Sequence, residues 1–341
     1  MDVNTKKKPF NKITKKSLIY TVLILFILAL ILIISIKLIK FNKKKVKINR
    51  TYIDKHKKEK EKTNKNTTNK ANINNDKCYS LSSENSNIKF IHLIITRFIM
   101  EFSKEFNKII YTEEYAKNGI RVMKKYLFPS LENQKCKDFT WVLMLGDKAN
   151  KNHIKSLLNM NDYSFKYKIV YQKDLKKYMI KNSKDLDFLI TTRIDYDDSI
   201  YYDAVNDARK QIDINKPIFL HGYNKGVYYF EENDKYYDYY NNFDNRGVMS
   251  IFISLILNLK KVNDTISIYD LGDHTYIKKT LLKKYKSFGI KELNYDPASF
   301  DESSQKFIYV RQNYSGAFDF TKKIPRISRP INFNLSSFYG K

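Results

Sequence analysis

The sequence predicts an α/β fold, with a mainly parallel sheet flanked by helices, preceded by one transmembrane helix. Short apolar runs rich in β-branched and aromatic residues alternate with amphipathic stretches, which is the pattern of βαβ units. Near the N-terminus, twenty successive residues carry no charged side chain. These observations divide the chain into an anchor and a folded body.

The predicted transmembrane helix is residues 17–36, SLIYTVLILFILALILIISI, which follow a basic tail at residues 1–16. At 1.5 Å per residue, this run matches a hydrocarbon core of about 30 Å. It is longer than the apolar part of a typical signal peptide and no small-residue cleavage site follows it, so we expect an uncleaved, single-pass anchor. Lysines crowd both flanks, which leaves the side of the membrane open. The more basic C-terminal flank favours a cytoplasmic body.

Residues 37–87 are predicted to form a flexible stem, because Lys, Asn and Thr dominate them and cannot bury enough surface to offset the chain entropy. Residues 1–77 hold 21 Lys and Arg against 5 Asp and Glu, so most of the net charge of +27 lies outside the body. The body contains no basic nucleic-acid module or zinc pattern, so we expect no nucleic-acid partner. Cys78 and Cys136 belong to no C-x-x-C pair, and we expect both to be unpaired thiols.

The folded body is predicted to span residues 88–326, with residues 327–341 as a C-terminal tail. His92 is expected to be a core residue of the first strand. A helix should start at Thr112 and stop at Pro129. Further strands and helices are expected as follows: buried strands at 88–98, 138–147, 167–171 and 188–194, a helix at 202–211, a hairpin of 217–223 with 227–230, a strand at 265–269, and either a helix or a strand at 249–259.

An acidic turn follows the strand at residues 188–194 and consists of Asp195, Tyr196, Asp197 and Asp198. In open α/β sheets, ligands bind beyond the carboxyl ends of the strands. Asp195 and Asp197 could both face Mg²⁺ or Mn²⁺, which takes its remaining ligands from water and substrate phosphates. An acidic turn that caps the next helix is the alternative. A second Asp-x-Asp, Asp185 with Asp187, precedes the strand and is expected to be a solvated turn.

Four segments together resemble a known family. They are HLIITRF at residues 92–98, RVMKKYLFPSLENQ from residue 121 with DFTWVLML from residue 138, TTRIDYDDSI at residues 191–200, and GDHTYI at residues 272–277. In this order and spacing they resemble the bacterial and viral glycosyltransferases grouped as rhamnosyltransferases, which are similar to the GT-A fold, a Rossmann-like mixed sheet. The resemblance covers roughly residues 88–326, and the lysine-rich anchor and stem fall outside it.

The resemblance implies a membrane-anchored, metal-dependent glycosyltransferase that moves a hexosyl or deoxyhexosyl group, rhamnose by the family name, from a nucleotide-sugar donor to a glycan or glycoconjugate. Asp195 and Asp197 would hold Mn²⁺ or Mg²⁺ on the donor diphosphate, and His274 would complete the metal site. The other implied roles are donor binding by Thr96, Arg97, Arg121, Asp147, Arg193 and Asp198, and general-base catalysis by Asp273 or Asp270.

Two alternatives remain open on the sequence alone. An apolar strand followed by Asp-x-Asp-x-Ser also resembles the haloacid-dehalogenase phosphatases, in which Asp195 would be a nucleophile and Asp197 a general acid. About a hundred folded residues precede Asp195, whereas that motif normally ends the first strand of its domain. The other alternative is a non-catalytic, membrane-tethered binding protein. P-loop, H-E-x-x-H and G-x-S-x-G motifs are absent.

Overall fold

The computed structural model describes residues 78, 87–101, 104–232, 234–240, 252–272, 276–290, 298–301, 304–311 and 330–341. They belong to one unit of the chain, Asn74–Lys341. Within these ranges we find no helix that is both long and apolar enough to cross a bilayer. The expected anchor at residues 17–36 lies outside them.

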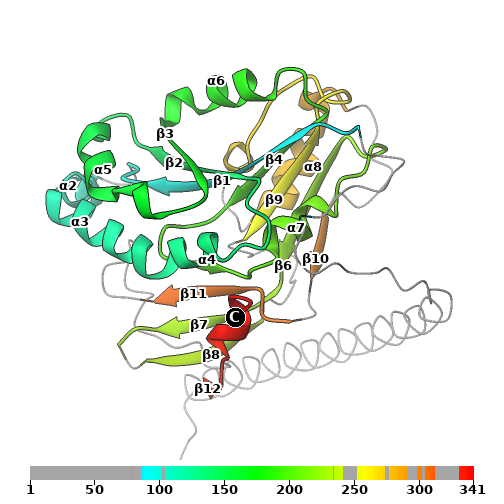
Figure 1. Cartoon of the computed structure of the whole chain (residues 1–341). Helices are drawn as coiled ribbons and strands as arrows, with labels where there is room; N and C mark the ends of the chain where they lie inside the picture. The colour runs from blue at the N-terminus through cyan, green and yellow to red at the C-terminus, as the bar shows by residue number, and fades with distance from the viewer. Residues whose placement is uncertain are drawn as a thin grey trace, which may run out of the picture. The chain divides into compact units, whose positions relative to one another are not determined.

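The larger sheet contains β1 (Phe90–Phe98), β2 (Thr140–Leu145), β3 (Lys166–Tyr171), β4 (Phe188–Arg193), β6 (Ile218–Tyr223), β9 (Ile253–Asn258) and β10 (Ala298–Asp301). Their spatial order is β10-β6-β9-β4-β1-β2-β3 (Figure 1). Among the described strands of this sheet, β9 alone runs antiparallel to its neighbours, β4 and β6. The prediction of a mixed, mainly parallel sheet is therefore confirmed, and the ambiguous run at 249–259 contains a strand.

Helices cover both faces of this sheet. Successive side chains of a strand point to opposite faces, so Ile94 of β1 joins one core cluster while Leu93 and Ile95 join another. The first face is covered by α3 (Glu113–Val122), α4 (Phe128–Glu132), α5 (Lys151–Leu158) and α7 (Ala204–Arg209), and the second by α6 (Gln172–Ser183) and α8 (Ile277–Lys284). His92 is a core residue as predicted, and its Nε2 lies 2.7 Å from Thr192 Oγ1.

The helix that starts at Thr112 does not stop at Pro129. The Thr112 hydroxyl caps α3 by accepting a hydrogen bond from the backbone N–H of Tyr115 (3.2 Å). The helix then passes through a π-helical turn, η2 (Met123–Leu127), into α4, where Pro129 occupies the first turn. The π-helical turn lies just before the proline, and the Phe128 N–H donates to the Met123 carbonyl five residues back, so the regular i to i−4 pattern that proline would break is already interrupted.

A smaller sheet contains β5 (Ser199–Ile200), β7 (Lys225–Phe230), β8 (Lys235–Tyr240), β11 (Phe307–Arg311) and β12 (Pro330–Ile331), in the order β12-β8-β7-β11-β5. The predicted hairpin of 217–223 with 227–230 is wrong, because β6 belongs to the larger sheet and β7 pairs with β8. Asn224, the single residue between β6 and β7, is fully buried. The chain therefore passes directly from one sheet to the other.

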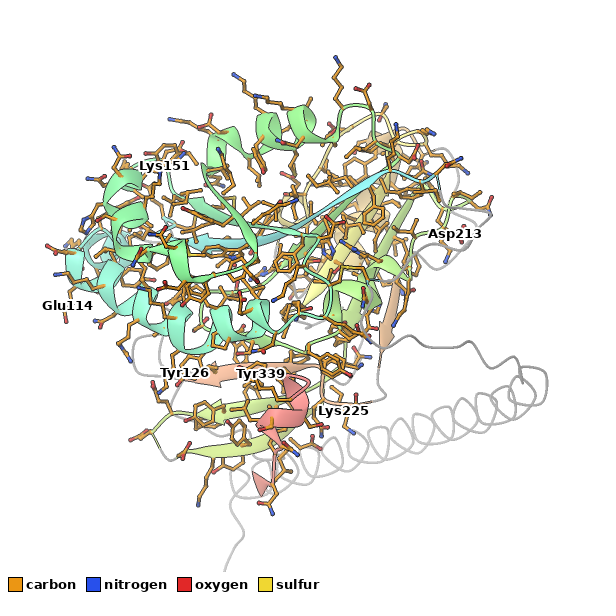
Figure 2. All side chains as sticks on the ribbon, viewed as in Figure 1. Glu114, Tyr126, Lys151, Asp213, Lys225 and Tyr339 are labelled. Atoms are coloured by element: carbon orange, nitrogen blue, oxygen red, sulfur yellow. A yellow bond between two sulfur atoms is a disulfide. The ribbon has the colours of Figure 1, made fainter. Side chains whose placement is uncertain are left out.

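The last twelve residues, predicted as part of a tail, belong to the fold. β12 pairs with β8, and α9 (Leu335–Phe338) buries Phe338. Phe338 belongs to the same apolar cluster as Tyr126 of η2, and Tyr339 packs against that cluster. Figure 2 shows Tyr126 and Tyr339 at the seam between the helices and the smaller sheet.

Cys78 and Cys136 form a disulfide with a Cα–Cα distance of 4.7 Å, so the prediction of unpaired thiols is wrong. The two cysteines are 58 residues apart, and spacing alone does not reveal such a long-range pair. Cys136 Sγ also accepts a hydrogen bond from Nη1 of the buried Arg209 (2.8 Å). The Arg209 guanidinium lies 4.9 Å from the centre of the Phe90 ring, so the disulfide lies close to the start of β1.

Candidate functional site

The site is built where β1, β2 and β4 end. These strands are parallel neighbours, with Arg97 of β1 opposite Met144 of β2, and Ile95 opposite Arg193 of β4, so their carboxyl ends share one edge of the sheet. The acidic turn follows β4 directly. The order of the strands therefore brings the Arg97 end of β1 beside Arg193 and the acidic turn.

The acidic turn is closed by a hydrogen bond from the Asp198 backbone N–H to the Asp195 carbonyl (3.3 Å). Asp195 and Asp197 are partly exposed, whereas Asp198 is buried. Asp198 Oδ1 accepts a hydrogen bond from the backbone N–H of Val310 in β11 (3.2 Å). The Asp198 carboxylate therefore joins the turn to the smaller sheet, and its donor-binding role stays a prediction.

Two arginines and a tyrosine lie beside the turn. Arg193 is buried and its Nη2 donates to Asp195 Oδ2 (3.2 Å). The guanidinium carbons of Arg97 and Arg193 lie 5.0 and 5.3 Å from the ring centre of Tyr269, within cation–π range. The Tyr269 hydroxyl donates to the Ile95 carbonyl (3.2 Å), which fixes the ring against β1.

Burial raises the pKa of Tyr269 to about 12, against the opposing effect of the two guanidinium groups, so the ring stays neutral. Because the Tyr269 ring carries no charge, it can attract both guanidinium groups without neutralising either of them. Planar guanidinium groups bind phosphate oxygens through paired hydrogen bonds. The arrangement of Arg97 and Arg193 therefore suits a diphosphate. Tyr269 was missed from sequence, where it appeared only as the end of an expected strand.

An aromatic cluster borders the other side of the turn. The Tyr196 ring packs edge-on against Phe98 (5.4 Å between centroids), and Tyr115 of α3 stacks on Phe98 (6.0 Å). The Tyr115 and Tyr196 hydroxyls are 3.5 Å apart. Burial and then the negative charge of Asp197 raise the pKa of Tyr115, which places that hydroxyl near the turn. No spacing in the sequence pointed to this contact between α3 and the turn.

Gly119 allows α3 to approach this closely. A Cβ atom at Gly119 would overlap the ring of Phe98. Phe98 in turn supports both Tyr115 and Tyr196. The position of the turn's aromatic wall therefore depends on the missing side chain of Gly119.

Three predicted site residues are engaged apart from the acidic turn and its two arginines. Thr96 is fully buried and its hydroxyl accepts a hydrogen bond from Trp141 Nε1 (3.0 Å), so it does not face a donor. Asp147 Oδ1 lies 3.4 Å from the backbone nitrogen of Lys173, in the first turn of α6. Arg121 is exposed and its charge acts on Tyr126 and Glu231, at the smaller sheet. These residues were selected because they lie at strand ends or carry a charge. Neither criterion gives the direction in which a side chain points.

Asp270 is part of a helix cap. Its Oδ2 accepts hydrogen bonds from the Ser267 backbone N–H (2.6 Å) and hydroxyl (2.9 Å), which starts a 3₁₀ turn, η4 (Ile268–Leu271). The expected strand at 265–269 is therefore wrong. The Asp270 carboxylate accepts the hydrogen bonds of the cap, which does not suit its predicted role as a general base. The other two candidates of this loop, Asp273 and His274, lie outside the described residues.

The second Asp-x-Asp, Asp185 with Asp187, directly precedes β4, as predicted. Asp187 accepts a hydrogen bond from the Lys89 backbone N–H (2.7 Å) and pairs with Lys260. Asp185 adopts a left-handed backbone (φ 67°) and is exposed. This pair is a turn at the amino end of the strand.

The chemistry of the acidic turn suits a metal ion. Over the described residues, no group of three or more His, Cys, Asp and Glu side chains is placed to bind a metal ion. Mg²⁺ and Mn²⁺ are commonly held by one or two carboxylates together with water and substrate phosphates. Asp195 and Asp197, two partly exposed carboxylates on one irregular turn, fit that pattern.

A groove of about 450 Å³ opens at the same edge, between the starts of α3 and α5. Ile99, just after β1, lines it with φ at 52°, a left-handed conformation that is rare for a β-branched residue and is found most often at functional sites. Tyr111, Asn150 and His153 contribute polar atoms to its lining. The groove therefore offers polar atoms to a ligand at the edge of the sheet where β1 and β2 end.

Comparison with known proteins gives a family match. Residues 88–260 match the family described as "Putative rhamnosyl transferase". No curated protein matches the chain. Among solved structures, TarS 1–349 of S. aureus is 11% identical, with 65% of this chain and 60% of that chain covered and a TM-score of 0.35. The inositol-1-phosphate CTP transferase of T. maritima is 11% identical (64% and 89% covered, TM-score 0.31), and HddC of Yersinia pseudotuberculosis is 13% identical (65% and 93%, TM-score 0.32).

Proposed function

Because the chain belongs to the rhamnosyl transferase family and is a glycosyltransferase, we propose that it is a membrane-anchored, metal-dependent enzyme that uses a nucleotide-sugar donor. The acceptor is a glycan or glycoconjugate, and the transferred sugar is rhamnose, as the family description suggests. The observation that carries this proposal is the acidic turn beside Arg97 and Arg193 at the carboxyl edge of the sheet.

In this proposal, Asp195 and Asp197 hold Mn²⁺ or Mg²⁺, which when bound neutralises negative charge on the leaving nucleoside diphosphate. His274, three residues before α8 in the sequence, is the proposed third protein ligand. Arg193 orients Asp195 through its hydrogen bond to Oδ2. Asp273 is the proposed general base, since Asp270 is engaged as a helix cap.

The donor's other parts are assigned from the shape of the edge. The diphosphate contacts the guanidinium groups of Arg97 and Arg193, which Tyr269 holds together. The nucleoside occupies the groove lined by Ile99 and Tyr111, next to the end of β1. Tyr196 and Tyr115 cover the opposite side of the turn and limit the access of water to the reacting sugar.

The test is donor hydrolysis by the full chain, purified in detergent and supplied with a panel of nucleoside-diphosphate sugars that includes a rhamnose donor. We expect hydrolysis that requires Mn²⁺ or Mg²⁺ and stops with a chelator. Asp195→Asn and Asp197→Asn should each lower the rate at least a hundredfold while the protein stays folded, because both acids are partly exposed and asparagine at 195 keeps an oxygen that can accept from Arg193.

Asp185→Asn is the matched control, because asparagine tolerates the left-handed backbone at that position. It should keep the wild-type rate. Full activity in the presence of the chelator would refute the metal, and equal losses in all three variants would show that the acidic turn has no special role.

A further inference from the structure

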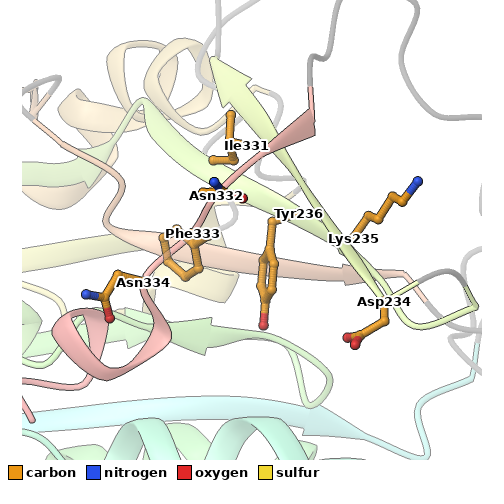
Figure 3. Close-up of a pocket in the computed structure, with 7 residues that line it drawn as sticks. All are labelled: Asp234, Lys235, Tyr236, Ile331, Asn332, Phe333 and Asn334. Carbon is orange, nitrogen blue, oxygen red and sulfur yellow. The ribbon is translucent and has the colours of Figure 1, made fainter.

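The smaller sheet carries a second groove, separate from the acidic turn. It has a volume of about 600 Å³ and lies between the β7–β8 hairpin and the C-terminal segment (Figure 3). Tyr236 and Phe333 form its aromatic wall, with ring centroids 5.0 Å apart. Asp234, Asn332 and Asn334 lie around the rings and are exposed.

This lining matches the chemistry of a sugar. A pyranose has faces of C–H groups and a rim of hydroxyls that both donate and accept hydrogen bonds. The negative face of an aromatic ring attracts C–H groups, and the two rings are only partly buried, so they remain accessible. Carboxylate and amide side chains supply both acceptors and donors for the hydroxyls.

The walls of the groove are held in place. The Tyr229 hydroxyl donates to Asp234 Oδ1 (2.8 Å), which fixes the carboxylate at the hairpin. On the other wall, Asn334 Oδ1 accepts a hydrogen bond from the Ser337 backbone N–H (2.9 Å). A binding site with fixed polar groups loses less side-chain entropy when a ligand is bound.

The groove and the acidic turn lie on the same face of the smaller sheet. Tyr196 of the turn, Tyr236 and Phe333 all pack against one apolar cluster, which includes Val227 and Ile308. The Tyr339 hydroxyl donates to Ser199 Oγ (3.4 Å), so the segment that lines the groove also reaches the residue after the turn. The groove and the acidic turn therefore border the same packed apolar cluster from two sides.

The distance between them sets the size of the ligand. β8, which carries Tyr236, is three strands away from β5, which begins directly after Asp198. At about 4.8 Å per strand, this corresponds to about 14 Å across the sheet. A single sugar ring cannot span that distance, whereas a short oligosaccharide can.

We propose that this groove binds the acceptor as an oligosaccharide, holding a sugar residue remote from the one that is glycosylated. The proposal rests on the proposed function, because it assigns the distal part of the acceptor of the same reaction. It predicts that the enzyme binds short oligosaccharides more tightly than the corresponding monosaccharides.

The test is binding of the full-length, detergent-purified protein to an array of immobilised short oligosaccharides and their constituent monosaccharides. We expect Tyr236→Ala and Phe333→Ala to weaken oligosaccharide binding at least tenfold, with monosaccharide binding and donor hydrolysis unchanged. Tyr236→Phe should keep the binding, because it keeps the ring. Tyr167→Ala, at an exposed tyrosine of β3, is the control.

Wild-type binding to no oligosaccharide, or equal binding by Tyr236→Ala and the wild type, would overturn the proposal. Donor hydrolysis is measured separately and does not need the acceptor. Its loss in the wild type would overturn the proposed function, whereas its presence without oligosaccharide binding would overturn the groove alone.

Discussion

Arg97 and Arg193 share the ring of Tyr269, and this residue-scale feature places two guanidinium groups beside the acidic turn. Two guanidinium groups repel each other unless something between them offsets the repulsion. The negative faces of the ring provide that attraction, and a hydrogen bond to the Ile95 carbonyl keeps the ring in position.

Two replacements of Tyr269 should separate the contribution of its aromatic ring from that of its hydroxyl. Tyr269→Phe keeps the ring and should change the KM for the donor less than threefold. Tyr269→Leu removes the aromatic faces and should raise the donor KM at least tenfold, equivalent to about 1.4 kcal/mol. Steady-state donor hydrolysis measures both, and an equal effect of the two variants would show that the hydroxyl matters instead of the ring.

The buried imidazole of His92 should make the free energy of unfolding depend on pH. Burial, and then the charge of Arg209, lower its pKa from 6.5 to about 3, so the folded protein holds it neutral. The unfolded chain binds the proton more readily, and stability should therefore fall as the pH drops from about 6.5 towards 3, by up to about 1.4 kcal/mol per pH unit. Melting temperatures between pH 7 and pH 5 measure the slope.

His92→Gln should be less stable at pH 7, because it disturbs the contact with Thr192, yet lose less stability on acidification. His153→Gln, at a half-exposed position of α5, is the control variant. An unchanged slope in His92→Gln would show that other groups cause the acid sensitivity.

Residue types and strand positions predicted the acidic turn, and the family resemblance added Arg97 and Arg193 as donor-binding residues. They could not select Tyr269, Tyr115 or Tyr196 as their neighbours, because those contacts join elements far apart in the sequence. Thr96 failed as a prediction because alternation along β1 turns its hydroxyl into the core, towards Trp141.

At the scale of elements, the acidic turn is a junction between two sheets. β4 leads into it from the larger sheet, β5 leaves it in the smaller sheet, and Asp198 bonds to β11. Strand periodicity located β4 and β6 correctly. It located β7 but paired it with the wrong strand, because the chain changes sheets at the buried Asn224 where a hairpin turn was expected.

Asp198→Ala should therefore behave differently from Asp195→Asn and Asp197→Asn. It leaves the buried Val310 backbone N–H without its acceptor, which should cost about 1–3 kcal/mol of unfolding free energy. Denaturant titration measures this loss. If the variant is as stable as the wild type but does not bind the donor, Asp198 has a donor-binding role and not a structural one.

At the scale of the whole molecule, the disulfide closes a loop of 58 residues. On the chain-entropy model, such a cross-link contributes about 4 kcal/mol, so Cys136→Ser and reduction of the wild type should both lower the melting temperature markedly. The reductant should have no effect on Cys78→Ser. Recovery of both thiols as alkylated cysteines from protein purified without reductant would contradict the pairing.

Disulfides persist in oxidising compartments and are rare in the cytosol. The bond therefore favours an oxidising compartment for the described part of the chain, whereas the lysines after residue 36 favoured a cytoplasmic body. The distribution of charge along the sequence does not reveal the compartment in this way, because the pairing of Cys78 with Cys136 depends on the fold.

The disulfide also decides where a mechanical load on the N-terminal part of the chain would act. Cys136 precedes β2, and Arg209 contacts both Cys136 and Phe90, so the bond lies at the amino edge of the larger sheet. Tension arriving through residue 78 would pass into that edge, one strand length away from Asp195 and Arg97. A pull on the chain before Cys78 would therefore load the amino ends of the strands first, while the acidic turn lies at their carboxyl ends.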